Sequence, residues 1–255
     1  MTLMNSLMAK SRRLKLDSLA FASLLALIFA ISMMSAQAQS VYSPGGLFIH
    51  PTAYTAPSHQ FSVYAAAFTQ DEESGRSQAY FPLALTYAPT DKLQVSALAV
   101  YHEGKNAAPY GHFGAFVKYQ LLSDTRSHPA FALSGAYVAN DELESSIAGV
   151  FSRAFTRQGR LFATLHLGVK WGRSSDGNGG ANDFGGFVGA QIPLSREWNL
   201  VGETSSRLKF DRASASSVGF MYQTRKGFGI SLGLVNSGRS SRMNPFFGVG
   251  IPVGN

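Results

Sequence analysis

Apolar and polar residues alternate with a period of two along most of the chain. In the stretch 161–171 every odd position is apolar, and the even positions include His166 and Lys170. Successive side chains of a β-strand point to opposite faces, so this spacing predicts a strand with one apolar and one polar face. Because the alternation recurs and helical spacing occurs only near the N-terminus, the pattern predicts an all-β protein.

Twelve strands are predicted, and many of them have ten or more residues. They cover residues 60–69, 78–89, 93–103, 112–122, 129–140, 145–156, 160–172, 183–194, 197–207, 215–225, 228–236 and 244–254. Strands of soluble sheets commonly have about five or six residues, whereas a tilted strand needs about 9–11 to cross a bilayer. These lengths predict a single domain, residues 60–255, that forms an antiparallel transmembrane β-barrel of about twelve strands.

The connections between the predicted strands support a barrel over a soluble sandwich. Most odd-numbered connections are longer than the even-numbered ones, and the longest is 173–183. Long extracellular loops and short periplasmic turns are typical of outer-membrane barrels, whereas a sandwich does not sort its loops in this way. Barrel closure also leaves no unpaired strand edge in lipid. Aromatic residues near the predicted strand ends fit interfacial girdles, namely Tyr87, Tyr119, Trp171, Trp198 and Tyr222.

The N-terminus has the three parts of a secretory signal. Basic residues between Lys10 and Lys15 precede an apolar run over 19–34, and small residues surround Ala38. This order predicts a signal peptide over residues 1–38, cleaved after Ala38. The alternative is a retained anchor, but 16 residues are few for a spanning helix.

Charge and cysteine content narrow the function classes. The predicted signal holds four of the 22 basic residues and one of the 15 acidic residues, so the remainder has 18 and 14, a net charge of +4. No basic run suggests a nucleic-acid partner. The absence of cysteine excludes disulfides and an acylated lipoprotein cysteine.

These features together resemble bacterial outer-membrane β-barrel proteins over nearly the whole mature length. The stretch Gly46-Leu47-Phe48-Ile49-His50-Pro51-Thr52-Ala53 is also similar to the N-terminal stretch of outer-membrane barrels associated with exopolysaccharide production. The resemblance implies contact with the outer-membrane bilayer, lipopolysaccharide and the outer-membrane assembly machinery. The chain departs from the common aromatic terminus of such barrels, because it ends Pro252-Val253-Gly254-Asn255.

No residue pattern indicates catalysis or a bound metal. The six histidines are scattered, and none stands two residues before a serine, the spacing of phospholipase-type barrels. The loop beginning at Asp176 starts like a calcium loop but lacks the later turn glycine and bidentate glutamate. We therefore expect no enzyme activity, no metal site and no cofactor.

Polar residues on the inward parity are the candidate site. The candidates for lumen-facing residues are Lys118, His166, Lys170, Gln191, Glu203, Arg207 and Gln223. Two interpretations stay open. One is a filled, hydrogen-bonded interior in which a basic neighbour compensates Glu203. The other is a narrow pore for anionic or sugar solutes.

Residues 39–59 form a periplasmic or lumenal segment before the first strand. Its apolar residues need a partner, and its prolines prevent a regular central strand. We hypothesise that 41–58 enters the barrel as a plug and packs against inward glycines. The predicted plug contacts are Leu47, Phe48, Ile49, Gly229, Gly233, Gly248 and Gly250, with Gly219 in the same stripe. The alternatives are a segment across the periplasmic mouth, or glycines that only relieve crowding.

The sequence thus favours a channel or export component for a small polar solute or glycan in the Gram-negative outer membrane. A structural or cell-surface interaction barrel with a plugged lumen is the second hypothesis. A lipid-modifying outer-membrane enzyme is the third, and the histidine spacing disfavours it.

Overall fold

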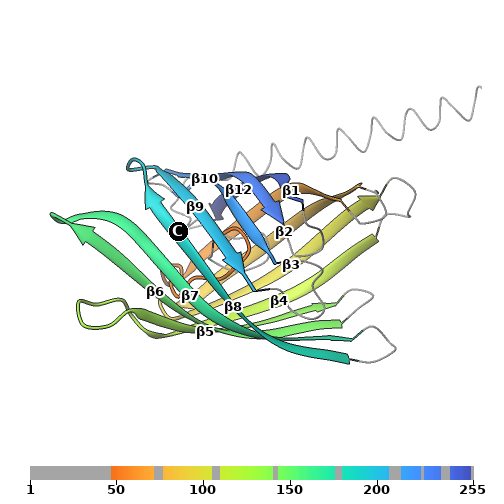
Figure 1. Cartoon of the computed structure of the whole chain (residues 1–255), viewed down its shortest axis with the longest axis horizontal. Coiled ribbons are helices and arrows are strands. Elements are labelled where there is room, and N and C mark those ends of the chain that lie inside the picture. Colours follow the sequence, from red (N-terminus) through yellow and green to blue (C-terminus); the bar gives the residue numbers. More distant parts are fainter. Residues whose placement is uncertain are drawn as a thin grey trace, which may run out of the picture. The chain divides into compact units, whose positions relative to one another are not determined.

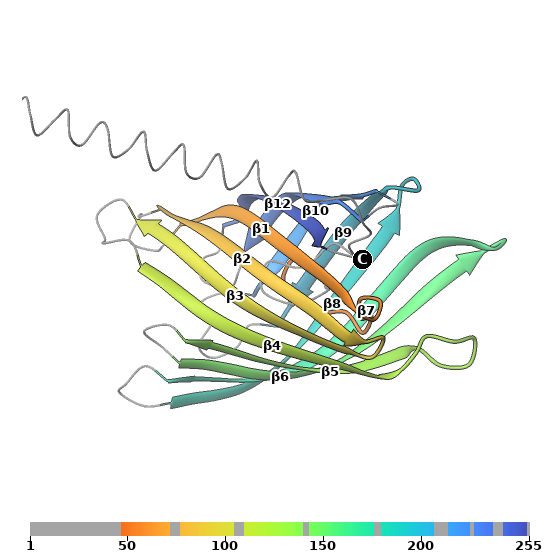
Figure 2. The same ribbon diagram turned by 180° about the vertical axis from the view of Figure 1, so that it is seen from behind.

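The computed structural model describes residues 47–71, 77–104, 110–139, 143–175, 180–206, 214–224, 227–236 and 242–253. Twelve antiparallel strands form a closed barrel in which each strand pairs with its sequence neighbours and β1 pairs with β12. Figures 1 and 2 show this ring of strands from two sides. The strands are β1 (Gln60–Asp71), β2 (Ser77–Thr90), β3 (Leu93–Gly104), β4 (Tyr110–Leu122), β5 (Ala130–Ala139), β6 (Leu143–Arg157), β7 (Arg160–Ser175), β8 (Gly180–Pro193), β9 (Trp198–Ser205), β10 (Ser216–Gln223), β11 (Gly229–Asn236) and β12 (Asn244–Val253).

All twelve predicted strands are confirmed in order and pairing. The largest difference lies between β7 and β8, where the predicted loop 173–183 is mostly strand and Ser175 pairs with Gly180. These residues carry no apolar alternation and have the composition of a loop, yet the pairing of β7 with β8 extends to Ser175 and Gly180. Residues 176–179 lie outside the described part of the chain.

The alternation places apolar side chains outside the barrel and polar ones inside. On β7, Leu165 and Leu167 are 46 % and 61 % exposed, whereas His166 between them is 1 % exposed. The same alternation of exposed and buried residues follows β3, β8 and β10. An apolar outer belt around a closed ladder is the surface that a bilayer requires. Among the described residues, no helix is long and apolar enough to cross a membrane.

The barrel has two ends that are defined by its topology. The terminal end is where β1 begins and β12 ends, and the loop end is the opposite one. Aromatic side chains gather at the terminal end, where Phe61 stacks on Tyr87 and Trp198 lies 5.1 Å from Tyr222 between ring centroids. Tyr119, on the same end of β4, is exposed. This arrangement matches an interfacial girdle.

Arg153 occupies an outward position on β6, on the same parity as the apolar residues Ile147 and Phe151. Its guanidinium turns to the connection between β4 and β5, where it lies 3.3 Å from Asp124 Oδ1 and donates to the carbonyl oxygens of Thr125 and Arg126. The stem of Arg153 can therefore stay on the apolar face while the charge reaches the terminal end.

The segment 47–59 lies inside the barrel, beside the start of β1 in both views (Figures 1 and 2). Leu47, Phe48, Ala53 and Ala56 are buried, and Leu47 and Phe48 join a cluster with inward residues of the strands. Residues of this segment therefore pack against inward residues of the strands.

Candidate functional site

A continuous row of inward residues crosses five strands and forms the wall that the segment contacts. Ser152, His166, Gly189, Glu203 and Ser217 are directly paired from β6 to β10. All five are buried. We call these five residues the lumen row. Because paired residues on one face of a sheet lie side by side, the row is a path of closely spaced groups around the lumen.

Glu203 is the most heavily bonded residue of the lumen row. Its carboxylate accepts hydrogen bonds from the backbone N–H groups of Ile49 and His50, at 2.6 and 2.9 Å, and from the Ser217 hydroxyl at 2.7 Å. The Nδ1 atom of His50 lies 2.9 Å from Glu203 Oε2. A buried carboxylate is stable only when such partners replace water. The imidazole beside the Glu203 carboxylate therefore comes from the segment itself, at His50.

Gly189 leaves a gap in the lumen row that the segment fills. A Cβ atom at this position would collide with Cδ1 of Leu47, so any larger residue here would require the Leu47 side chain to shift. The adjacent Phe187 stacks on the His50 ring with centroids 4.5 Å apart and an interplanar angle of 18°. On β8, the space beside Gly189 thus receives Leu47 of the segment, and the Phe187 ring receives His50.

Ser152 and His166 hold the middle of the segment. The Ser152 hydroxyl accepts a hydrogen bond from the Ala53 N–H at 2.8 Å and lies 2.8 Å from His166 Nδ1. This pair joins a potential nucleophile to a potential base, and it is cross-strand, so a search for same-strand spacing misses it. The segment covers the pair, and among the described residues we find no carboxylate bonded to His166 Nε2, which has no partner.

The base of the segment is bonded near the terminal end. Lys118, which is fully buried, donates to the Tyr54 carbonyl oxygen. The Ala56 N–H donates to Gln94 Oε1 at 3.1 Å, and the Tyr54 hydroxyl donates to Asp124 at 3.1 Å. The segment is therefore held along its length by the wall of the barrel.

The Ser58 N–H donates to Asp91 Oδ1 at 2.7 Å, in the turn between β2 and β3. This hydrogen bond lowers the pKa of the Asp91 carboxyl below its ordinary value of 3.8, and the nearby His59 contributes to the same direction. Asp91 is thus ionised as it caps the chain that leads into β1.

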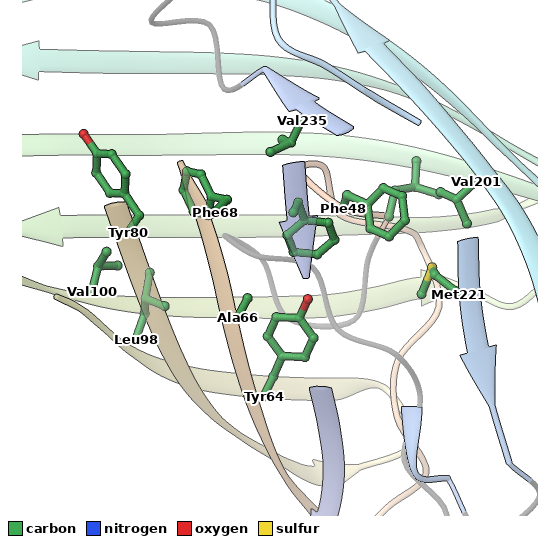
Figure 3. Close-up of a cluster of buried hydrophobic side chains, with 12 residues drawn as sticks. Phe48, Tyr64, Ala66, Phe68, Tyr80, Leu98, Val100, Val201, Met221 and Val235 are labelled. Carbon is green, nitrogen blue, oxygen red and sulfur yellow. The ribbon is translucent and has the colours of Figure 1, made fainter. Parts of the chain in front are cut away.

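Apolar residues line the other side of the lumen. Phe48 meets Phe246 of β12 edge to face, with centroids 5.1 Å apart, and lies among side chains of β1, β9, β10 and β11 in Figure 3. This cluster makes the interior less polar than the inward parity of the sequence suggests. It also explains why Leu47 and Phe48 are stable inside the barrel.

The glycine contacts expected for the plug need correction. The space in front of Gly248 and Gly250 is occupied by the Tyr64 ring of β1. Gly219 and Gly233 face each other, and a Cβ on either would collide with the backbone of the neighbouring strand. These glycines therefore serve close strand packing, and the glycine that receives the segment is Gly189. Gly229 pairs with Gly250 across β11 and β12.

The remaining lumen-facing candidates lie on β7, β8 and β10 or outside the described residues. Lys170, Gln191 and Gln223 are half-buried on β7, β8 and β10, and Arg207 lies outside the described residues. His102 and His112, which the sequence analysis did not single out as a pair, are buried on β3 and β4 with their Nε2 atoms 2.5 Å apart. Within the described ranges, no group of three or more His, Asp or Glu residues could hold a metal ion.

Comparisons with known proteins show a fold but no family. No protein-family model matches the sequence, and neither does any curated protein. The KdgM porin, solved in complex with disordered oligogalacturonate, has a TM-score of 0.54 and 10 % identity over 76 % of this chain and 99 % of its own. The translocator domain of the autotransporter NalP from Neisseria meningitidis has a TM-score of 0.48 and 11 % identity over 77 % and 88 %. A Rhodopseudomonas blastica porin mutant has a TM-score of 0.29 and 10 % identity over 76 % and 98 %. The likeness to the first of these and the apolar outer belt show an outer-membrane-type β-barrel.

Proposed function

We propose that this protein is a channel or export component of the bacterial outer membrane, that it passes a small polar solute or a glycan, and that the segment 47–59 closes it. One observation carries the proposal: side chains of the barrel wall bind the backbone of this segment inside the lumen. A polar wall around a removable occupant is the arrangement that a gated pore needs.

Opening does not require the barrel to break. The ladder closes through β1 and β12 from Phe61 to Phe68, so the sheet is complete without residues 47–58. Release of the segment therefore exchanges side-chain hydrogen bonds and apolar contacts for water. Local opening of this kind costs less free energy than global unfolding.

The proposal includes an orientation and a set of partners. The terminal end faces the periplasm and the loop end faces the outside, where loops meet lipopolysaccharide, as the even strand count favours. The chain reaches the outer membrane after removal of residues 1–38, and the assembly machinery inserts it. We propose no catalytic role, because His166, which lies beside the Ser152 hydroxyl, has no carboxylate on its Nε2 atom in the described part of the chain to orient it as a base.

A second candidate is a structural or cell-surface barrel whose lumen stays plugged. The observation that favours it is the apolar cluster, in which Leu47 and Phe48 are 0 % and 1 % exposed. Burial of such side chains stabilises each by roughly 1.5–3 kcal/mol, which opposes release. Conductance separates the two candidates.

The test uses a disulfide that can be closed and opened in one protein. The chain has no cysteine, so Leu47→Cys with Gly189→Cys creates a single possible bridge between the segment and β8. The two positions are suitable because a Cβ at 189 would lie against the Leu47 side chain. In planar bilayers, the reduced protein should show channel openings that the oxidised protein lacks.

The Leu47→Cys variant alone is the matched control and should conduct equally with and without oxidant. Equal conductance of the double variant in its oxidised and reduced forms, with the bridge verified by mass spectrometry, would refute gating by the segment. Full conductance of both forms would refute the closed state, and none in either would favour the plugged barrel.

A further inference from the structure

We propose that the wall beneath the segment is a binding track for an uncharged oligosaccharide, which takes the place of residues 49–56 when the segment leaves. This inference rests on the proposed function and specifies its substrate class. The track consists of Phe187, Glu203, Ser152, His166, Lys118 and Gln94.

The track contains hydrogen-bond acceptors and a hydrogen-bond donor. Glu203, Ser152 and Gln94 accept from backbone N–H groups, whereas Lys118 donates to a backbone carbonyl. When the segment leaves, these buried groups need new partners along the same path. A hydroxyl group both donates and accepts, so a chain of hydroxyls can satisfy all of them.

Two polar side chains of the track each have one atom that the segment does not bond. Gln94 Nε2 and His166 Nε2 are buried, and neither has a hydrogen-bond partner in the described part of the chain. Each of the two residues is 1 % exposed. Buried polar atoms in native structures are rarely left unpaired, which indicates that the peptide is an imperfect occupant. A ligand with more hydroxyl groups would pair both.

Phe187 gives the track an apolar platform. Its ring is covered by the parallel His50 ring at 4.5 Å, and departure of the segment exposes that face to the lumen. The flat C–H face of a sugar ring matches an aromatic face in shape and polarity. An aromatic platform next to polar groups that fix orientation is the usual composition of a small-molecule site.

The charges of the track favour a neutral chain. The track holds one acidic residue, Glu203, and one basic residue, Lys118, and both are buried in the lumen. A polyanion would meet the Glu203 carboxylate after the segment has removed His50 from it, and a polycation would meet Lys118. An uncharged polyhydroxylated chain brings no charge of the same sign near either side chain.

The experiment measures block of single-channel current by three probes: maltohexaose, hexagalacturonate and a Gly/Ser hexapeptide. The full chain carries Phe48→Ala, which removes an apolar anchor of the segment and leaves the track intact. Maltohexaose should block at the lowest concentration. Phe187→Leu and Gln94→Leu should each raise its half-blocking concentration roughly tenfold, which equals about 1.4 kcal/mol. Phe184→Leu, the same change on the outer face of β8, should leave the block unchanged.

Tighter block by hexagalacturonate or by the hexapeptide would overturn the inference, as would block that neither track variant weakens. If the reduced double-cysteine variant conducts but maltohexaose does not block the current, the channel proposal is supported and the binding track is refuted. If nothing conducts, a fluorophore on Ser58→Cys reports displacement of the segment instead. A saturable response to maltohexaose that Phe187→Leu abolishes would then support the track without passage, and no response would refute it.

Discussion

The two sides of the lumen hold the same segment by different means. From β3 to β9 the wall offers buried polar side chains that bond to its backbone, such as Gln94, Ser152 and Glu203. From β10 to β1 the wall is mostly apolar, with Met221, Val235 and Phe246 in the cluster, and Tyr64 fills the space in front of Gly248. Only the first side fixes which residue of the segment lies where.

The polar contacts specify the position of the plug, whereas the apolar contacts only accommodate it. A hydrogen bond has a defined partner and direction, so the polar side sets the register of residues 49–58. Apolar contact is non-directional, so the second side mainly excludes water. Mutations on the polar side should therefore release the segment, whereas those among the strand glycines should weaken the barrel.

The largest effect is expected for Glu203→Ala. It leaves the N–H groups of Ile49 and His50 and the Ser217 hydroxyl without their acceptor, and loss of one partner of a buried charged network costs about 3–5 kcal/mol. The free energy of local opening should fall by that amount, as measured by proteolysis of the segment in vesicles. Glu197→Ala, in the turn between β8 and β9, is the control. Equal protease sensitivity of the two variants would show that Glu203 does not anchor the segment.

A pair of glycine substitutions compares the two sides directly. Gly189→Ala collides with Leu47, whereas Gly233→Ala collides with the β10 backbone. Overpacking costs about 1–3 kcal/mol in each case, but the first should increase opening of the segment and the second should lower the unfolding free energy of the barrel. Gly202→Ala has room and serves as control. If Gly233→Ala released the segment while the barrel kept its stability, the comparison would be reversed.

The sequence predicted the wall of the barrel well because alternation is a local property. The twelve strands follow from period-two spacing, and so do the inward positions of Lys118, His166 and Glu203. Even Arg153, which breaks the pattern on β6, keeps its outward position because its long side chain reaches the terminal end.

The contacts of the segment could not be read in the same way, because they depend on which strands face each other across the lumen. The glycines at 219, 229, 233, 248 and 250 form a clear stripe in the sequence, yet Tyr64 and the neighbouring backbones use most of that space. Gly189 is one glycine among many on β8, and only the row from Ser152 to Ser217 reveals its role. Strand shear, which creates this row, leaves no mark on a single strand.

A smaller effect is expected for Tyr54→Phe. The change removes one hydrogen bond to Asp124, which also accepts from the Ala154 N–H, so the carboxylate stays partly satisfied. We expect the opening free energy to fall by about 0.5–1.5 kcal/mol, as measured by the same proteolysis. Tyr137→Phe, on an exposed tyrosine of β5, should change nothing. A loss as large as that of Glu203→Ala would place the main anchor at the terminal end instead.

The smallest effect is expected when the pH is lowered, and it arises at the point where the segment joins β1. The Ser58 N–H bond holds the pKa of Asp91 below 3.8, so the folded carboxyl has a lower pKa than the detached one. Its contribution to docking is therefore complete above the ordinary pKa and is lost as the pH falls through the folded value. In an NMR titration in micelles, the Ser58 amide shift should move with a midpoint below 3.8, and Asp91→Asn should abolish that transition. Because Asp91 is exposed, conductance should barely change over this range. A titration midpoint of the Ser58 amide at or above pH 3.8 would show that this hydrogen bond does not hold the base of the segment. The bond from Gln94 would then be the polar anchor nearest to β1.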